Sequence, residues 1–196
     1  MINMKADETS EVLYLGEQTT LNRVVELMNQ NEVVILPCDT IYGLCAKVGP
    51  AEQTLRNIKG REETKPFIQL ATVEQALAMC DVPEEIRSLW PCPLTCIMNR
   101  KDGKGTVAVR VPSDPFLQAL MAKLDSPIYS TSVNESGYES LTNIMDIIYT
   151  YKDRIPAFVV GGEKQGTVPS TLLNVTTTPY TVIRQGSYEV SSLLNA

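Results

Sequence analysis

The chain has 196 residues, of which 43% are hydrophobic and 20% charged, a composition typical of one globular domain. It contains no histidine, which excludes Ser-His-Asp triads, Cys-His dyads and zinc sites built on imidazole. Proton transfer would therefore fall to lysine, tyrosine, carboxylates, the substrate or water. The formal net charge of -6 argues against a surface that binds nucleic acid throughout, but it is compatible with a local cationic pocket.

The five cysteines are dispersed, and no two have the two-residue gap of a redox or zinc motif. We interpret them as buried structural thiols of a protein in a reducing compartment. Residues 1–11 hold no apolar run typical of a signal peptide, and no stretch approaches the roughly 20 apolar residues of a membrane span. We therefore expect a cytoplasmic protein without a membrane partner.

The first third of the chain predicts two helices around a buried strand. Thr20 is expected to cap a helix whose apolar residues recur at helical spacing. The apolar run 33–36 indicates a strand that stops at Pro37, and a second helix is predicted from Pro50 to about Lys59.

Two capping patterns predict the next helices. A short strand over 67–70 precedes a helix capped by Thr72 with Gln75. Asp81 with Glu84 forms a similar capping box before another helix.

The second half of the chain predicts a hairpin, two helices and further strands. Asp-Gly between the apolar runs 94–99 and 106–111 is typical of an antiparallel hairpin. The other predicted elements are a helix around 116–124, a strand ending at 129, a helix over 144–151, and strands over 158–160, 172–175 and 180–184. We therefore predict an α/β fold in which residues 1–196 form a single domain around a twisted, open sheet of mixed parallel and antiparallel strands flanked by helices.

The first candidate for chemistry is the polar segment 37–44, which directly follows a buried strand. Polar groups at a strand end followed by glycine occur where open α/β sheets bind ligands. An ordinary turn, with Asp39 bonded to its own backbone, explains the segment equally well.

A second candidate is a group of cations, Lys59, Arg61 and Lys65. Arginine offers a planar fork for phosphate or carboxylate, and lysine offers a compact charge. A solvated helix end neutralised by neighbouring glutamates is the alternative. The sequence has no Walker A loop and no Gly-x-Gly-x-x-Gly turn, so side chains would do more of any phosphate binding.

Further candidates are associated with later strands. Segment 130–137 offers hydroxyl and amide groups that suit a polar substrate or phosphate oxygens, although a hydroxyl-rich turn is the alternative. Arg110 stands in an otherwise apolar strand and needs an anionic partner, either a ligand carboxylate or a structural Asp or Glu. Ser170 precedes another strand, and Arg184 ends one.

Together these segments resemble the YrdC-like family of threonylcarbamoyl-AMP synthases, in its short form with the catalytic domain alone. The motifs occur in the family's order between about residues 12 and 190. They are PCDTIYGL at 37–44, IKGR at 58–61 with KPF at 65–67, WPCPLT at 90–95, VRVP at 109–112, STSVNESG at 130–137, PST at 169–171 and IRQG at 183–186.

The chain departs from the family pattern at three motif positions. Glu62 stands where proline usually follows the Lys-x-Arg motif, Cys92 replaces the glycine of Pro-Gly-Pro, and Val133 replaces the alanine of Ser-Ala-Asn. We expect Val133 to add bulk beside the polar loop and Cys92 to remove flexibility. The segment between Gly43 and Lys59 is also shorter than usual, and the chain stops where the family's catalytic domain stops.

The resemblance implies a nucleotidyltransferase that joins L-threonine, bicarbonate or carbon dioxide, and ATP into threonylcarbamoyl-AMP, with release of pyrophosphate. Mg²⁺ carried by ATP would assist, and no metal ligand in the protein is expected. The product would pass to a transferase complex that modifies tRNA at adenosine 37. Double-stranded RNA or tRNA is a further expected partner.

The resemblance also implies roles for individual residues. Those expected to bind ATP are Lys59, Arg61, Thr106, Ser132, Asn134 and Arg184. Those expected to bind threonine are Thr40, Tyr42, Arg110, Ser130 and Ser170, with Arg110 on the carboxylate. Lys59, Arg61 and Lys65 are the expected catalytic cations, and Lys65 would attract bicarbonate or the carbamate.

Three other functions remain open at this point. One is a carbamoyl-transfer enzyme that uses carbamoyl phosphate or carbamoyl-adenylate, and another is a module that binds double-stranded RNA or a nucleotide. The third is a paralogue with a different small substrate, which the departures at Glu62 and Val133 make credible.

Overall fold

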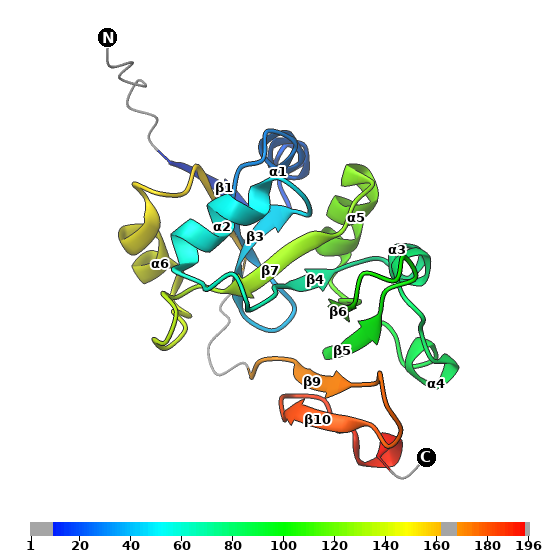
Figure 1. The fold of residues 1–196 in the computed structure, drawn as a ribbon. Helices are drawn as coiled ribbons and strands as arrows, with labels where there is room; N and C mark the ends of the chain where they lie inside the picture. Colours follow the sequence, from blue (N-terminus) through cyan, green and yellow to red (C-terminus); the bar gives the residue numbers. More distant parts are fainter. Residues whose placement is uncertain (1–9, 162–167, 195–196) are drawn as a thin grey trace.

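The computed structural model describes residues 10–161 and 168–194, in which ten strands form one sheet with helices on both faces (Figure 1). The strand order is β1-β8-β2-β3-β7-β4-β6-β5-β9-β10. The strands are β1 (Glu11–Tyr14), β2 (Val34–Pro37), β3 (Tyr42–Lys47), β4 (Ile68–Leu70), β5 (Leu94–Asn99), β6 (Thr106–Arg110), β7 (Ile128–Ser132), β8 (Ala157–Val160), β9 (Thr171–Asn174) and β10 (Thr181–Arg184). The helices are α1 (Thr20–Asn29), α2 (Ala51–Lys59), α3 (Val73–Met79), α4 (Glu84–Arg87), α5 (Pro115–Leu124), α6 (Ile144–Tyr151) and the 3₁₀ turn η1 (Ser191–Leu193).

Parallel and antiparallel pairs occur together in this sheet. Strand β8 is parallel to both β1 and β2, and the pairs β4–β6 and β5–β9 are also parallel. The pairs β2–β3, β3–β7, β4–β7, β5–β6 and β9–β10 are antiparallel. The predicted α/β class with a mixed sheet is confirmed, as is the hairpin that joins β5 to β6.

The side-chain alternation of β2 shows how the sheet is covered. Val34 and Leu36 pack in one cluster with α1 and α5, whereas Ile35 packs in another cluster with α2 and α6. Successive side chains of a strand point to opposite faces, so one buried strand serves two cores. A third cluster lies where α3 and α4 pack near β5, β6 and β9.

Two predicted helix caps are wrong. Thr20 is the first residue of α1, and its hydroxyl donates to the Tyr14 carbonyl at 2.8 Å instead of capping the helix. Helix α4 begins after Pro83 without a side-chain cap, so Asp81 and Glu84 form no capping box. The capping box at the start of α3 is confirmed, with both of its reciprocal hydrogen bonds present.

The segment predicted as a polar strand end is the tip of a hairpin. Strand β3 pairs with β2, and the amide of Cys38 donates to the Ile41 carbonyl at 3.2 Å, which closes the turn. Strand β3 then pairs with β7, which continues to Ser132 instead of ending at Tyr129. The hairpin therefore brings the polar tip beside the hydroxyl-bearing end of β7. The edge strand β1 was also not predicted.

Candidate active site

A cavity of about 220 Å³ opens beside the tip of the β2–β3 hairpin. Polar segments far apart in the chain contribute to its wall. Among them are the hairpin tip, Arg61 in the loop that follows α2, and the ends of β6, β7 and β10. Eight of the predicted site residues line it: Thr40, Tyr42, Arg61, Arg110, Ser130, Ser132, Ser170 and Arg184.

Arg61 is held at the cavity wall by the loop that follows α2. Its Nε donates to the Lys65 carbonyl at 3.0 Å and its Nη2 to the Pro66 carbonyl at 2.9 Å. The guanidinium carbon lies 5.1 Å from the centre of the Phe67 ring, a cation–π distance. Burial, followed by the charge of Arg56, lowers the pKa of Arg61. The side chain is thus fixed in place without a counter-ion.

Arg184 is held at the cavity by one backbone group. Its Nη2 donates to the Ser170 carbonyl at 2.9 Å. Burial, followed by the charge of Arg110, lowers the pKa of Arg184. Within residues 10–161 and 168–194, neither Arg61 nor Arg184 forms an ion pair. Two cations without carboxylate partners in one wall favour an anionic ligand.

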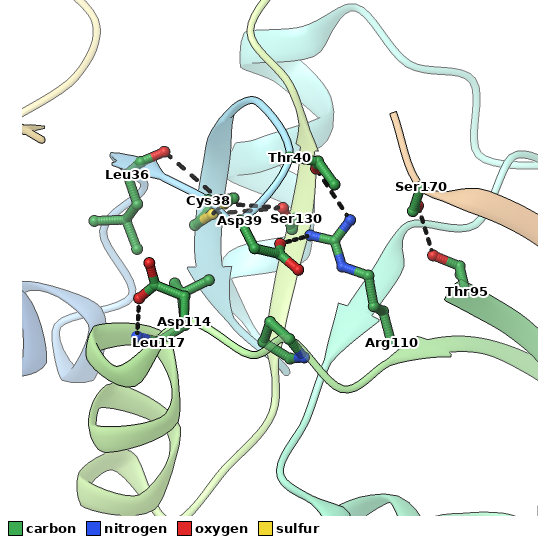
Figure 2. Close-up of polar contacts among 12 residues, drawn as sticks. Leu36, Cys38, Asp39, Thr40, Thr95, Arg110, Asp114, Leu117, Ser130 and Ser170 are labelled. Carbon is green, nitrogen blue, oxygen red and sulfur yellow. Dashed lines mark hydrogen bonds and ion pairs between the residues drawn. The ribbon is translucent and has the colours of Figure 1, made fainter. Parts of the chain in front are cut away.

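The third guanidinium, that of Arg110, has a carboxylate partner (Figure 2). Its Nη2 lies 2.8 Å from Asp39 Oδ1, and its Nη1 donates to Thr40 Oγ1 at 3.2 Å. The Arg110 and Asp39 side chains are only 6% and 9% exposed. The anionic partner that the sequence requires for Arg110 is therefore supplied, at least in part, by the protein itself.

Lys59 holds the end of β7 in place. Its Nζ donates to the Ser132 carbonyl at 2.6 Å, to Ser132 Oγ at 3.1 Å and to Asn134 Oδ1. Burial, followed by the charge of Arg61, lowers the pKa of Lys59 to about 8. Since each N–H of the ammonium has a protein acceptor, Lys59 shapes the cavity by fixing this loop. The Asn134 side chain is held by the same hydrogen bonds, because its Oδ1 accepts from both Lys59 Nζ and Ser132 Oγ.

Buried hydroxyl and thiol groups complete the wall. Ser130 Oγ lies 3.8 Å from Cys38 Sγ and 3.7 Å from Cys45 Sγ, and the Ser170 and Thr95 hydroxyls lie 2.8 Å apart (Figure 2). The five cysteines of the chain are free and buried, as predicted.

Four predicted site residues do not line the cavity: Lys59 and Asn134, which contact Ser132 of its wall, and Thr106 and Lys65. Thr106 is exposed at the start of β6, whereas Arg110 at the other end of the same strand reaches the wall. The Lys65 side chain is 59% exposed and pairs with Glu62 at 3.1 Å. Neither the Thr106 nor the Lys65 position supports the role expected for the residue.

The positions at which the chain departs from the family pattern do not line the cavity. Val133 is fully buried in the cluster that includes residues of α2 and α6, so the bulk expected beside the polar loop lies in the core and not in the cavity lining. Cys92 lies in the cluster beneath α3 and α4. The Glu62 carbonyl accepts a bond from Arg56 Nη1 at 2.7 Å, and its carboxylate faces Lys65.

Three contributors to the site were assigned no role from the sequence. Asp39 pairs with Arg110, and the Phe67 ring packs against the Arg61 guanidinium. Arg56 donates to two carbonyls of the loop that follows α2. The available signal for Asp39 was indirect: Arg110 stands alone in an apolar strand and therefore needs an anionic partner. Nothing local to the sequence distinguishes Arg56 from a solvated helix residue.

Comparison with known proteins assigns the chain to a family. The model of the Sua5, YciO and YrdC family, described as telomere recombination, matches residues 26–186. The chain belongs to this family. It is 28% identical over 193 residues to a threonylcarbamoyl-AMP synthase of Pyrococcus abyssi and 33% identical over 165 residues to one of Bacillus subtilis. These matches cover 90% and 76% of this chain but only 57% and 48% of the relatives, so the chain spans about half of their length.

Solved structures of the family share the fold. A crystal structure of P. abyssi Sua5 complexed with L-threonine matches with a TM-score of 0.86 and 26% identity, covering 95% of this chain and 60% of that one. E. coli YciO matches with a TM-score of 0.83 and 23% identity, covering 94% of this chain and all of that one. The predicted family membership and fold are thereby confirmed. No helix in the described ranges is long and apolar enough to cross a membrane.

Proposed function

We propose that the chain synthesises threonylcarbamoyl-AMP from L-threonine, bicarbonate or carbon dioxide, and ATP, with release of pyrophosphate. The observation that carries this proposal is the gathering of Arg61, Arg110 and Arg184 in one cavity lined by hydroxyl groups. Such a wall suits two anions held together, an amino-acid carboxylate and a polyphosphate. Relatives named threonylcarbamoyl-AMP synthase, and the Sua5 complex with L-threonine, support the choice of substrates.

The reaction needs positioning more than proton transfer. The threonine amine attacks carbon dioxide, a nitrogen–carbon bond forms, and the lost proton passes to water. A carbamate oxygen then attacks the α-phosphorus of ATP, and the bond to the bridging oxygen breaks as pyrophosphate leaves. Holding the two anions together and offsetting the charge on the leaving group are contributions that fixed cations supply. A site without histidine is therefore sufficient.

Each part of the wall has a task in this scheme. Arg110, beside the hydroxyls of Thr40, Ser130 and Ser170, would hold the threonine carboxylate. Arg61 and Arg184 lack counter-ions among the described residues and would face the phosphates. Lys59 would fix the loop that ends β7 against the nucleotide.

Magnesium would arrive with ATP and be held by the phosphates and water. Within the described ranges, no group of three or more His, Cys, Asp or Glu side chains is placed to hold a metal ion. The ion would offset charge on the phosphates during the displacement.

The product would be consumed by a transferase that modifies tRNA, and we propose that both act in the cytoplasm. A mixed anhydride of a carbamate and AMP is reactive, so direct transfer to a partner enzyme suits its chemistry. The net charge of -6 favours a partner that makes most of the contacts with tRNA.

Pyrophosphate release tests the proposed function directly. ATP, L-threonine and bicarbonate are supplied together, and each is then omitted in turn. We expect release to need all three, to be abolished in Arg61→Ala and Arg184→Ala, and to persist in the matched control Arg100→Ala. Arg100 pairs with Asp102 at 2.7 Å in the β5–β6 turn, away from the cavity lining. Near-normal release in either cavity variant would contradict the proposal.

The same assay separates the other functions. Dependence on a different amino acid would indicate a paralogue, although Val133 and Cys92 lie in the core and do not line the cavity. Release that requires carbamoyl phosphate would indicate carbamoyl transfer. Binding of double-stranded RNA without any pyrophosphate release would indicate a binding module.

A further inference from the structure

Asp39 is the one carboxylate in the described chain that pairs with a guanidinium of the cavity. Its Oδ1 forms an ion pair with Arg110 Nη2 at 2.8 Å, and both carboxylate oxygens are buried without a hydrogen-bond partner among the described residues. In Figure 2 the Asp39 carboxylate points at one terminal nitrogen of the guanidinium, and the Thr40 hydroxyl lies at the other. The Arg110 side chain thus has two contacts on the hairpin.

The pair joins parts of the sheet that are otherwise separate. Asp39 lies on the β2–β3 hairpin and Arg110 on β6, and strands β7 and β4 lie between them in the sheet. Cys38, beside Asp39, packs with α1 and α5, whereas the neighbours of Arg110 in β6 pack with α3 and α4. The ion pair therefore fixes the hairpin tip against a strand from a different core cluster.

The Arg110 backbone is already fixed, which leaves only its side chain to be oriented. Strand β6 is paired on one side with β4 and on the other with β5, where Arg110 lies opposite Leu70 and Thr95 respectively. Burying an arginine side chain in one rotamer costs conformational entropy, and a buried cation without a partner costs much more. The Asp39 carboxylate reduces both costs before any ligand arrives.

Arg110 keeps donors for a second anion. Nη2 lies 2.8 Å from Asp39 Oδ1, Nη1 donates to Thr40 Oγ1, and Nε is buried without a partner among the described residues. A guanidinium can hold two carboxylates at once because its N–H groups fan out in one plane. The free donors can therefore take a ligand carboxylate while Asp39 stays bound.

We propose that Asp39 is a positioning residue that sets the orientation of Arg110 and thereby the preference of the cavity for ligands that carry a carboxylate. This inference rests on the proposed function, because it concerns the pocket assigned to L-threonine. Asp39 acts through Arg110 and does not touch the ligand. Losing its charge leaves the guanidinium free to turn away from the binding geometry, so affinity for the carboxylate falls.

Calorimetric titration with L-threonine and with L-threoninamide tests the inference. The amide lacks the carboxylate, so the ratio of the two affinities reports on the groups that recognise the carboxylate charge, of which Arg110 is the proposed cation. We expect Asp39→Asn to lower this ratio by at least about tenfold, because truncating one partner disturbs the other member of a buried charge pair. Asp114→Asn makes the same chemical change at the cap of α5, where Oδ1 accepts from the Leu117 amide at 3.0 Å, and should leave the ratio unchanged.

A second pair of variants tests whether Asp39 acts through Arg110. Arg110→Met should abolish the preference for the acid, and adding Asp39→Asn to it should change nothing further. If Asp39→Asn alone does not fold, the double variant should fold again, because it leaves no unpaired buried cation. A further loss of threonine binding in the double variant, or a double variant that stays unfolded, would overturn the inference.

Failure of the inference and failure of the proposed function give different results. A wild-type preference in Asp39→Asn overturns the inference alone. Wild-type protein that binds neither L-threonine nor its amide overturns the proposed function, and the inference with it. A preference lost in Asp39→Asn and kept in Asp114→Asn supports both.

Discussion

Replacing Lys59 with methionine removes the ammonium that holds the end of β7 while keeping an apolar chain of similar length. The ammonium donates to the carbonyl and hydroxyl of Ser132 and to the amide oxygen of Asn134. After the change, these acceptors have no lysine donor. The loop that would face the nucleotide loses its side-chain tether to α2 and keeps the bond from the Ser136 amide to the Lys59 carbonyl at 2.9 Å.

The magnitude follows from the contacts. Hydrogen bonds to a charged group contribute about 1.5–3 kcal/mol each. Burial of the ammonium opposes them, and the fall of the Lys59 pKa from 10.5 to about 8 corresponds to about 3 kcal/mol. We expect Lys59→Met to lower the free energy of unfolding by about 3 kcal/mol, which at about 2–4 °C per kcal/mol lowers Tm by about 9 °C.

Urea titration and thermal unfolding followed by circular dichroism measure this loss. Lys47→Met is the matched control, because the Lys47 ammonium makes an exposed bond to Asn29 Oδ1 at 2.8 Å. The control should stay within about 0.5 kcal/mol of the wild type. A Lys59→Met variant as stable as Lys47→Met would refute the tethering role.

Three further predictions concern the same cavity. Gly43→Ala should lower the free energy of unfolding by about 1–3 kcal/mol in urea, because the new Cβ would lie 2.9 Å from Ser130 Oγ; unchanged stability would count against the packing of β3 on β7. The Lys59 amine should lose its proton as pH rises through about 8, seen by NMR as a titrating signal absent from Lys59→Arg, whereas a midpoint near the ordinary value of about 10.4 would rule out its burial. Arg56→Lys should raise the KM for ATP with little effect on that for threonine. One lysine nitrogen cannot replace both Nη1, which bonds two loop carbonyls at 2.7 and 3.1 Å, and the Nε and Nη2 that bond Glu52. Equal changes in both KM values would contradict this.

Elements with strong local signals were predictable from the sequence. The apolar spacing of α2, the Thr72–Gln75 capping box and the Asp-Gly hairpin each depend on neighbouring residues, and each is present. Strand β1 was not predictable because it is a four-residue edge strand without a buried side chain. Strand β3 was missed because Gly43 interrupts its apolar run beside a polar tip that is typical of a turn.

The cavity was predictable from the family motifs, whereas its internal pairing was not. Arg61, Arg110 and Arg184 come together as the motif order implies. The partner of Arg110 lies 71 residues away by sequence number, and the pairing depends on strand order, which no local pattern carries. Lys65 was predicted as a site residue because it lies in a family motif, yet its side chain is exposed to solvent.

The central claim is that one cavity holds both substrates, and a crystal structure with L-threonine and a non-hydrolysable ATP analogue tests it most directly. The account predicts the threonine carboxylate within hydrogen-bond distance of Arg110 and the phosphates beside Arg61 and Arg184. Either ligand bound outside this cavity, or phosphates facing away from both arginines, would contradict it.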